Sequence, residues 1–321
     1  MKLKTLTTIV GALALLACNR DNGDISPDNW NNEIRLSSGV TTPTRAYDSD
    51  TQIAAGEKIN VWVEDKNAMP LYENNILNAD GKGGFSYQTT MYYTSPDPVN
   101  IYAIHSNPAY TKTAFPSKDI PITHKTETDQ TTSAAYTASD LLFAIKKEVS
   151  STPDVIPLTF YHMLSKVEVV LKRGNGNPDL AGVVVTIDNT RTQATFRPDK
   201  NADMTQATAR AGMVEASGSI TPIIIPTMTT TDFNAPNIHY AEAIVVPQTV
   251  DVGKAFIRVK LPAPDGRTFI YKIPAGASLK LESGKKYIYN ITVDLNDLIV
   301  DSTIKDWEAV GQPREGSAFP E

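Results

Sequence analysis

The sequence predicts an all-β protein made of two β-sandwich domains in series. Short runs of alternating or β-branched residues recur along the chain between clusters of Gly, Pro and Asn, which is the pattern of strands joined by turns. No stretch shows the roughly 3.6-residue periodicity of an amphipathic helix. The 21 prolines and 18 glycines among 321 residues also suit many short strands connected by turns.

Residues 1–17 are a predicted export signal. Lys2 and Lys4 give it a basic start, and an apolar run extends from Ile9 to Ala17. This run is shorter than the roughly 20 residues that a transmembrane helix needs, and no later run could span a bilayer. Leu15-Leu16-Ala17-Cys18 resembles the lipobox of bacterial lipoproteins, in which the cysteine is acylated and becomes the new N-terminus. We therefore expect lipidation of Cys18; the alternative is an ordinary secretory signal beside an unmodified cysteine.

Residues 18–45 are expected to form a tether or propeptide. The segment is polar and rich in Asn, Asp, Ser and Thr, which favours disorder in part of it. One short apolar alternation interrupts it, Ile34-Arg35-Leu36-Ser37, and this alternation predicts a first strand.

Further strands are predicted from the alternating and β-branched runs that follow. They are Ile59 to Val63, Phe85 to Tyr93, Val99 to Ile104, Leu141 to Ile145, Ile156 to His162, Val167 to Leu171, Val183 to Ile187, Ile220 to Ile225, Ala243 to Val246, Phe256 to Leu261, Phe269 to Ile273 and Tyr287 to Leu295. Gly81-Lys82-Gly83-Gly84 lies between the first two of these runs and is interpreted as a hairpin turn between strands.

The clearest break in this series is the Gly- and Pro-containing stretch from Arg173 to Asp179. A boundary there gives an N-terminal domain over residues 46–172 and a C-terminal domain over residues 178–321. Each side then holds about seven strands, a number suited to a β-sandwich. A competing boundary before Phe160 would move two strands into the second domain.

Composition and motifs argue against nucleic-acid binding and against catalysis. The net charge is −6, and no basic stripe offers a site for several phosphates. The four histidines, His105, His124, His162 and His239, are scattered without the spacing of a zinc site. No nucleophile elbow or phosphate-binding loop is present. We therefore expect no enzyme activity, no metal and no cofactor.

Several tyrosines lie in predicted strands, among them Tyr87, Tyr92, Tyr93 and Tyr102. Core packing is the expected role of most of them. An exposed group of such rings would instead form a sugar-stacking platform, so a surface glycan-binding lipoprotein is the alternative function.

Three blocks in order are similar to the fimbrillin family, the type V pilins of Bacteroidales-type bacteria. The blocks are Ser139 to Ala144 (SDLLFA), Leu158 to Val167 (LTFYHMLSKV) and Leu281 to Val293 (LESGKKYIYNITV), and the last is followed by Ile304-Lys305-Asp306-Trp307. Each block is weak alone, but together with the lipobox they span nearly the whole chain.

The resemblance implies a structural subunit of a surface fimbria that mediates adhesion. Its domains would be β-sandwiches of the transthyretin-like or Greek-key type, and the lipid on Cys18 would carry it to the outer membrane and the cell surface. The implied partners are other fimbrial subunits, in a homopolymer or heteropolymer, and a host protein or glycan.

The resemblance also implies maturation and assembly by strand exchange. An arginine-specific protease would cut between Arg45 and Ala46, which lie in a polar, extended stretch open to proteolysis. Loss of the first strand would open a groove that another subunit's strand could fill. The donor candidate is the alternating segment that carries Leu298, Val300 and Ile304 on one face. The alternatives are a solvated loop arginine at position 45 and a last strand that stays in its own domain.

The C-terminal tail departs from the family pattern. Residues Glu308 to Glu321 include Pro313, Gly316 and Pro320, which suit a long donor strand poorly. A tip subunit, which accepts a strand but need not donate one, would tolerate such a tail. The resemblance therefore leaves open whether the subunit belongs to the shaft or to the tip.

Overall fold

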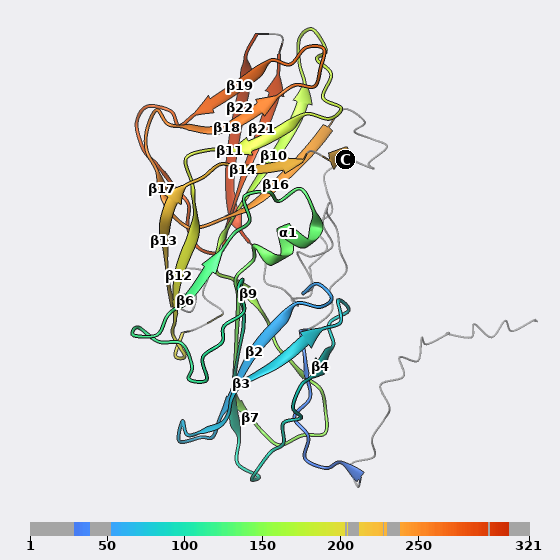
Figure 1. Ribbon diagram of the computed structural model, residues 1–321, viewed down its shortest axis with the longest axis vertical. Coiled ribbons are helices and arrows are strands. Elements are labelled where there is room, and N and C mark those ends of the chain that lie inside the picture. The colour runs from blue at the N-terminus through green and yellow to red at the C-terminus, as the bar shows by residue number, and fades with distance from the viewer. Residues whose placement is uncertain are drawn as a thin grey trace, which may run out of the picture.

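The computed structural model describes residues 29–38, 53–202, 204, 212–226, 228–229, 238–294 and 296–307. Strands dominate these residues, and one short helix accompanies them, α1 (Ser133–Ala138). The predicted all-β class is confirmed. Figure 1 shows two groups of strands stacked along the long axis of the molecule, the first in blue and green and the second in yellow to red.

The first group is built on a six-stranded antiparallel sheet. In spatial order its strands are β4 (Phe85–Tyr87), β3 (Pro70–Ala79), β2 (Lys58–Glu64), β5 (Val99–His105), β7 (Leu142–Val149) and β9 (Tyr161–His162). One face of this sheet presents Ile59, Val61 and Val63 of β2 to a closed apolar core. The other layer of that core is a parallel pair, β1 (Leu36–Ser37) with β8 (Ile156–Pro157).

The second group is a sandwich of a five-stranded sheet and a four-stranded sheet. The first contains β15 (Met228–Thr229), β16 (Ile238–Val245), β10 (Ser165–Arg173), β21 (Lys285–Val293) and β22 (Leu298–Asp306). The second contains β14 (Ile223–Pro226), β11 (Val184–Ile187), β18 (Ala255–Lys260) and β19 (Thr268–Lys272), and a small pair is formed by β17 (Thr249–Val250) and β20 (Leu279–Lys280). Alternate residues of both sheets, such as Val167, Val169, Val185 and Ile257, fill one core.

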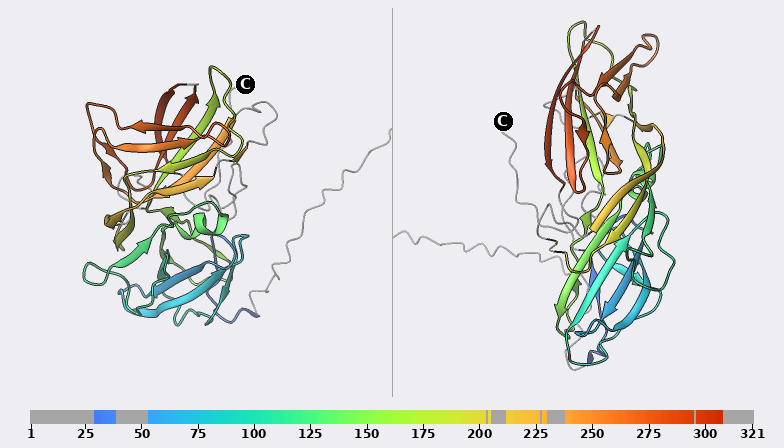
Figure 2. Two further views of the ribbon diagram at one scale, coloured as in Figure 1. Left: turned by 45° about the horizontal axis from the view of Figure 1, so that its top comes forward. Right: turned by 90° about the vertical axis from the view of Figure 1, so that its left-hand side faces the viewer.

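A three-stranded sheet joins the two groups. In it β12 (Arg191–Pro198) lies between β6 (Ile122–Lys125), from the first half of the chain, and β13 (Gly212–Ile220), and it is antiparallel to both. Figures 1 and 2 show these strands running between the two groups. Beneath them the ring of Phe143 packs on that of Phe196, with centroids 5.9 Å apart. The halves therefore share hydrogen bonds and an apolar joint.

Strand pairing differs from the predicted domain boundary at Arg173. Strand β10 ends at that residue, but it lies between β16 and β21, so it belongs to the second group. The first group extends to β9, which pairs with β7, so the pairing changes from one group to the other between β9 and β10. The domain limits stay a prediction. The Gly-rich stretch is a loop inside the second group. A side chain on Gly174 would overlap the Asp294 carboxylate, which accepts the Asn175 N–H at 2.7 Å, so close approach explains this glycine.

The predicted hairpin turn after residue 80 is confirmed. Strands β3 and β4 are antiparallel neighbours, and Asp80 Oδ1 accepts from the backbone N–H groups of Lys82 and Gly84 at 2.6 and 2.9 Å. The aspartate therefore closes the turn with side-chain bonds, as expected for an Asx turn.

A buried histidine at the joint predicts a stability change between pH 7 and pH 5. His124 is fully buried; its Nδ1 accepts from Asn107 N–H and its Nε2–H donates to Ser139 O, both at 3.0 Å. Burial lowers its pKa from 6.5 to about 4, so the folded protein keeps the ring neutral while the unfolded chain protonates it. Stability from this group is complete above pH 6.5 and falls by up to about 1.4 kcal/mol per pH unit below it. Denaturant unfolding of His124→Gln should show a flatter dependence over this range, and an unchanged slope would contradict the assignment.

Candidate functional site

The N-terminal segment, residues 30–38, is inserted into the first group of strands as a core element. Ile34, Leu36 and Ser38 are 0%, 4% and 1% exposed, whereas Glu33, Arg35 and Ser37 between them are partly exposed. This alternation is that of a strand with one face in the core. The predicted first strand is therefore present, at the dark-blue end of the described chain in Figure 1.

Both backbone edges of this segment are paired. On the side of β8, the N–H groups of Ile156 and Leu158 donate to Arg35 O and Ser37 O at 2.8 and 2.7 Å. On the other side the bonds are Ile34 N to Met91 O at 2.8 Å, Tyr93 N to Asn32 O at 2.8 Å, and Ser38 N to Gly83 O at 2.9 Å. We call the groove between residues 83–93 and residues 156–158 the N-terminal slot.

Two aromatic residues complete the N-terminal slot. The Leu36 N–H donates to the Tyr87 hydroxyl at 2.5 Å, so this side chain takes the place of a backbone acceptor. Burial raises the pKa of Tyr87 to about 12. At the start of the segment the Trp30 ring meets Tyr93 edge to face, with centroids 5.9 Å apart.

The predicted lipidation and cleavage residues, Cys18, Arg45 and Ala46, lie outside the described residues. They flank the segment in sequence, because Cys18 precedes residue 30 and Arg45 follows residue 38. Lipidation and cleavage therefore stay predictions.

The predicted donor segment forms β22, the edge strand of the five-stranded sheet. It pairs along its whole length with β21, from Leu298 opposite Val293 to Asp306 opposite Lys285. Leu298 and Val300 pack partly against the second core, whereas Ile304 is 59% exposed. In this arrangement β22 is the last strand of its own group, and its donation to another subunit stays a prediction.

A tryptophan directly after β22 anchors the strand at the joint. Trp307 is 3% exposed, and its ring stacks on His162 with centroids 3.7 Å apart and planes inclined by 4°. The Trp307 N–H also donates to Gly284 O at 2.8 Å. His162 Nδ1 is 2.8 Å from Asp140 Oδ2, and this hydrogen bond fixes the orientation of the His162 ring.

A second histidine, His105, also lies beside an acidic side chain. His105 Nε2 lies 3.0 Å from Glu57 Oε2, and this hydrogen bond lowers the pKa of Glu57. Across the described ranges no three His, Cys, Asp or Glu side chains meet in a group that could hold a metal ion. The described part of the chain also contains no helix with the length and hydropathy of a membrane span.

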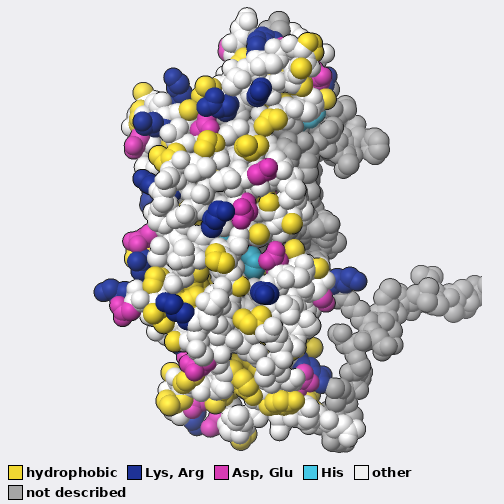
Figure 3. Space-filling model, in the orientation of Figure 1, with side chains coloured by type: hydrophobic (Ala, Val, Ile, Leu, Met, Phe, Trp, Pro, Cys, Tyr) yellow, Lys and Arg dark blue, Asp and Glu magenta, His cyan; other side chains and the backbone are white. Residues whose placement is uncertain are grey.

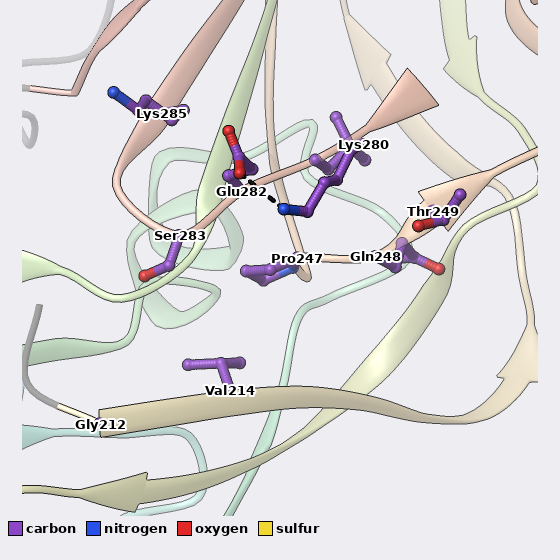
Figure 4. A pocket seen from close by; sticks show the side chains of 10 residues that line it. Gly212, Val214, Pro247, Gln248, Thr249, Lys280, Glu282, Ser283 and Lys285 are labelled. Atoms are coloured by element: carbon purple, nitrogen blue, oxygen red, sulfur yellow. Dashed lines mark hydrogen bonds and ion pairs between the residues drawn. The ribbon is translucent and has the colours of Figure 1, made fainter. Parts of the chain in front are cut away.

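A shallow pocket of about 380 Å³ lies between β13 and the β20–β21 turn. Figure 4 shows Lys280 reaching the Glu282 carboxylate, at 2.9 Å. The other lysine of the pocket, Lys285, pairs with Asp306 at 2.6 Å. Both cationic groups already have carboxylate partners, so the pocket offers little to an anionic ligand. On the face drawn in Figure 3, basic and acidic side chains are interspersed.

Three of the four tyrosines considered for a sugar platform are buried or line the N-terminal slot. Tyr93 and Tyr102 are 5% and 3% exposed, and Tyr87 is partly buried in the slot. Tyr92 is the one exposed residue of the four, at 39%. These four residues therefore do not build an exposed platform.

The sequence did not predict the contacts of Tyr87 and Trp307 or the burial of Ser38. The bond from Leu36 to the Tyr87 hydroxyl and the stacking of Trp307 on His162 join residues 51 and 145 positions apart, and no local pattern signals such contacts. Ser38 could have been found, because it continues the alternation of Ile34 and Leu36.

The family model described as fimbrillin-like matches residues 44–307. A Bacteroides uniformis relative, described as a candidate fimbrium subunit and called Fim1C, is 25% identical over 321 residues, which covers 96% of this chain and 96% of that protein.

Two crystal structures of candidate cell adhesion proteins share the fold. One, from Bacteroides uniformis, is 20% identical with a TM-score of 0.59 and covers 86% of this chain and 97% of its own. The other, from Bacteroides ovatus, is 18% identical with a TM-score of 0.62 and covers 86% and 96%.

Proposed function

The chain belongs to the fimbrillin-like family, and we propose that it is a structural subunit of an adhesive cell-surface fimbria that assembles by replacement of its N-terminal strand. Its role is structural, without catalysis. Fim1C, described as a candidate fimbrium subunit, supports the fimbrial role, and the two similar structures of candidate cell adhesion proteins agree with it.

The observation that carries the assembly proposal is the N-terminal slot. The segment that fills it ends at Ser38, and Arg45 follows in the sequence before the first sheet begins at Lys58. Cleavage after Arg45 would therefore separate the inserted segment covalently from every other strand of the first group. The family match begins at residue 44, beside this arginine.

Withdrawal of the segment would leave the slot in a state that favours a new strand. The carbonyls of Gly83 and Met91 and the N–H groups of Tyr93, Ile156 and Leu158 would lose their partners. The positions of Ile34 and Leu36 would become an apolar groove. Unpaired buried backbone groups are costly, and an incoming strand satisfies them by β-augmentation.

The predicted lipid on Cys18 fits this sequence of events as a delivery device. Acylation would hold the precursor on the outer membrane through residues 18–45. An arginine-specific protease would then cut the covalent link between the lipidated segment and the folded chain, so that withdrawal of the segment would release the chain and empty the slot. The partners of the mature form would be other fimbrial subunits and, at the free surface, a host protein or glycan.

Cleavage of the purified precursor tests this proposal. An arginine-specific protease should yield a chain that starts at Ala46 and, with time, higher-order polymers visible by size-exclusion chromatography. Arg45→Ala should remain monomeric under the same treatment. Arg20→Ala is the matched control, because Arg20 precedes the inserted segment and cleavage there leaves the slot filled; this variant should polymerise normally. A cut wild-type chain that stays monomeric would contradict the proposal.

A further inference from the structure

The sheet formed by β14, β11, β18 and β19 turns one face to solvent, and this outer face carries three exposed aliphatic side chains. They are Val184, Ile224 and Ile270, which are 38%, 42% and 43% exposed. The residues next to them in the strands, such as Val185 and Ile225, fill the second core, so the pleat directs the three outward. This sheet lies at the front of the upper group in Figure 1, and Figure 3 shows apolar side chains among lysines and arginines on that part of the surface.

The register of the strands places these side chains in adjoining rows. Neighbouring positions across the sheet are, in order, Asp129, Ile224, Thr186, Arg258 and Ile270. The next row along the strands contains Val184, Lys260 and Thr268. Directly opposed side chains on one face of a sheet are about 4.5–5.5 Å apart, and the stem of an arginine is itself apolar. The aliphatic groups therefore form one continuous strip across the outer face.

Charges of opposite sign lie at the two edges of this outer face. At the β14 edge, the exposed Asp129 carboxylate has no ion-pair partner among the described residues. Towards the β19 edge, Lys260 and Lys272 are exposed and are likewise unpaired within the described ranges. Arg258 beside them is paired with Asp188 at 2.8 Å. The outer face is thus acidic at one edge, apolar in the middle and basic at the other edge.

This order of charges is complementary to itself. A half-turn about an axis parallel to the strands lays the face of a second copy on the first and reverses its edges, so that each acidic edge meets a basic one. We propose that the outer face binds the same face of a second copy of this chain, with Asp129 of each copy opposite Lys260 of the other. Such an isologous contact stacks two sheets, which pack about 10 Å apart, and buries the aliphatic strip of both copies. A polyanionic ligand would gain the lysines but would be repelled by Asp129.

The contact is small, so it should be weak between single chains. With strands about 4.8 Å apart and residues about 3.3 Å apart, the outer face spans roughly 300 Å², against about 800 Å² per partner in a stable complex. A fibre would repeat the face once per subunit, and linked contacts raise the overall affinity by roughly 10²–10⁴. The consequence for fibres rests on the proposed function: neighbouring fimbriae would associate side by side through this face.

Charge reversal tests the pairing without any cleavage. Uncut Arg45→Ala chains should form reversible dimers in sedimentation velocity at concentrations up to about 1 mM. Adding Asp129→Lys or Lys260→Glu should weaken the dimer roughly tenfold, because like charges then face each other in both charge contacts. An equimolar mixture of these two variants should regain the affinity, because both charge contacts of the mixed pair are attractive.

Two control variants leave the outer face untouched. Lys118→Glu alters the net charge as Lys260→Glu does, but at an exposed lysine of the first group, and should dimerise like the parent. Ile224→Ser should weaken the dimer, whereas Met69→Ser, at a residue 62% exposed in the first group, should not. Absence of dimers, or a mixture that dimerises no better than each charge variant alone, would overturn the inference. Binding of an acidic polysaccharide that is lost in Lys260→Glu, without dimers, would also overturn it and would assign the face to a polyanion.

The cut chain separates this inference from the proposed function. Wild-type fibres should sediment as bundles at low speed, whereas Lys260→Glu fibres should form equally fast and stay dispersed. Dispersed wild-type fibres, together with no dimers of the uncut chain, would overturn the inference and leave the proposed function standing. Dimers of the uncut chain without any fibres after cleavage would instead support the pairing and contradict the proposed function.

Discussion

Replacing Lys166 with alanine is expected to lower the free energy of unfolding by about 3–5 kcal/mol. Lys166 lies on β10 with its side chain 1% exposed, and its Nζ is 2.6 Å from Glu242 Oε2 on β16. The Tyr136 hydroxyl donates to the same carboxylate at 3.3 Å. Loss of the ammonium would remove the Lys166 cation that faces the buried Glu242 carboxylate, which is the costly way to break a buried ion pair.

The control for this variant is an exposed pair of the same type. Lys280 Nζ is 2.9 Å from Glu282 Oε1, with side chains 74% and 47% exposed, so Lys280→Ala should cost about 0–1 kcal/mol. The double variant Lys166→Met with Glu242→Gln removes both charges and keeps an acceptor for Tyr136, so it should be more stable than Lys166→Ala. Urea unfolding of the four proteins measures this order. A cost for Lys166→Ala no greater than that for Lys280→Ala would contradict the argument.

Replacing Trp307 with alanine is also expected to cost about 3–5 kcal/mol. Its ring fills the joint between the two groups and stacks on His162, and its backbone ties the end of β22 to Gly284. The variant should lower the stability of the whole fold and should also weaken the attachment of β22 in particular, because β22 would lose its anchor at one end. Ile304→Ala, at an exposed position of the same strand, should change stability by no more than about 0.5 kcal/mol.

Hydrogen exchange distinguishes an anchor from a general packing residue. In Trp307→Ala the amides of β22 should exchange much faster, whereas those of β2 and β5 should follow only the change in global stability. Uniform acceleration in all strands would show that Trp307 stabilises the joint without holding β22 in particular.

Strands made of alternating apolar or β-branched residues could be predicted from the sequence, and strands without such a pattern could not. The runs at Ile59, Val167 and Phe256 alternate or are β-branched throughout, and each lies in a strand of the structure. Strand β3 carries Glu73, Asn74 and Asn75 in its centre, so it shows no apolar period. Strand β13 is exposed or partly exposed over its length, and helix α1 has only six residues, too few for a helical period.

The candidate site was predictable where it depended on local alternation. The first strand at Ile34 and the strand at Leu298 both followed from apolar residues at every second position. The parallel pairing of β1 with β8 did not, because Leu36 and Ile156 are brought together only by the fold of the intervening sheet. The Gly-rich stretch after Arg173 is ambiguous in the sequence for a related reason: Gly174 serves close packing against Asp294 within one sandwich, and composition alone does not distinguish such a loop from a linker.

N-terminal sequencing of the assembled, cell-surface form of the protein tests the central claim most directly. If the N-terminal segment is removed to open the slot, the subunits in the fibre should begin at Ala46, while the lipidated precursor in the membrane fraction should begin at Cys18. Fibres whose subunits retain acylated Cys18 would contradict the account, because residues 30–38 would then still be covalently joined to the chain whose slot they fill.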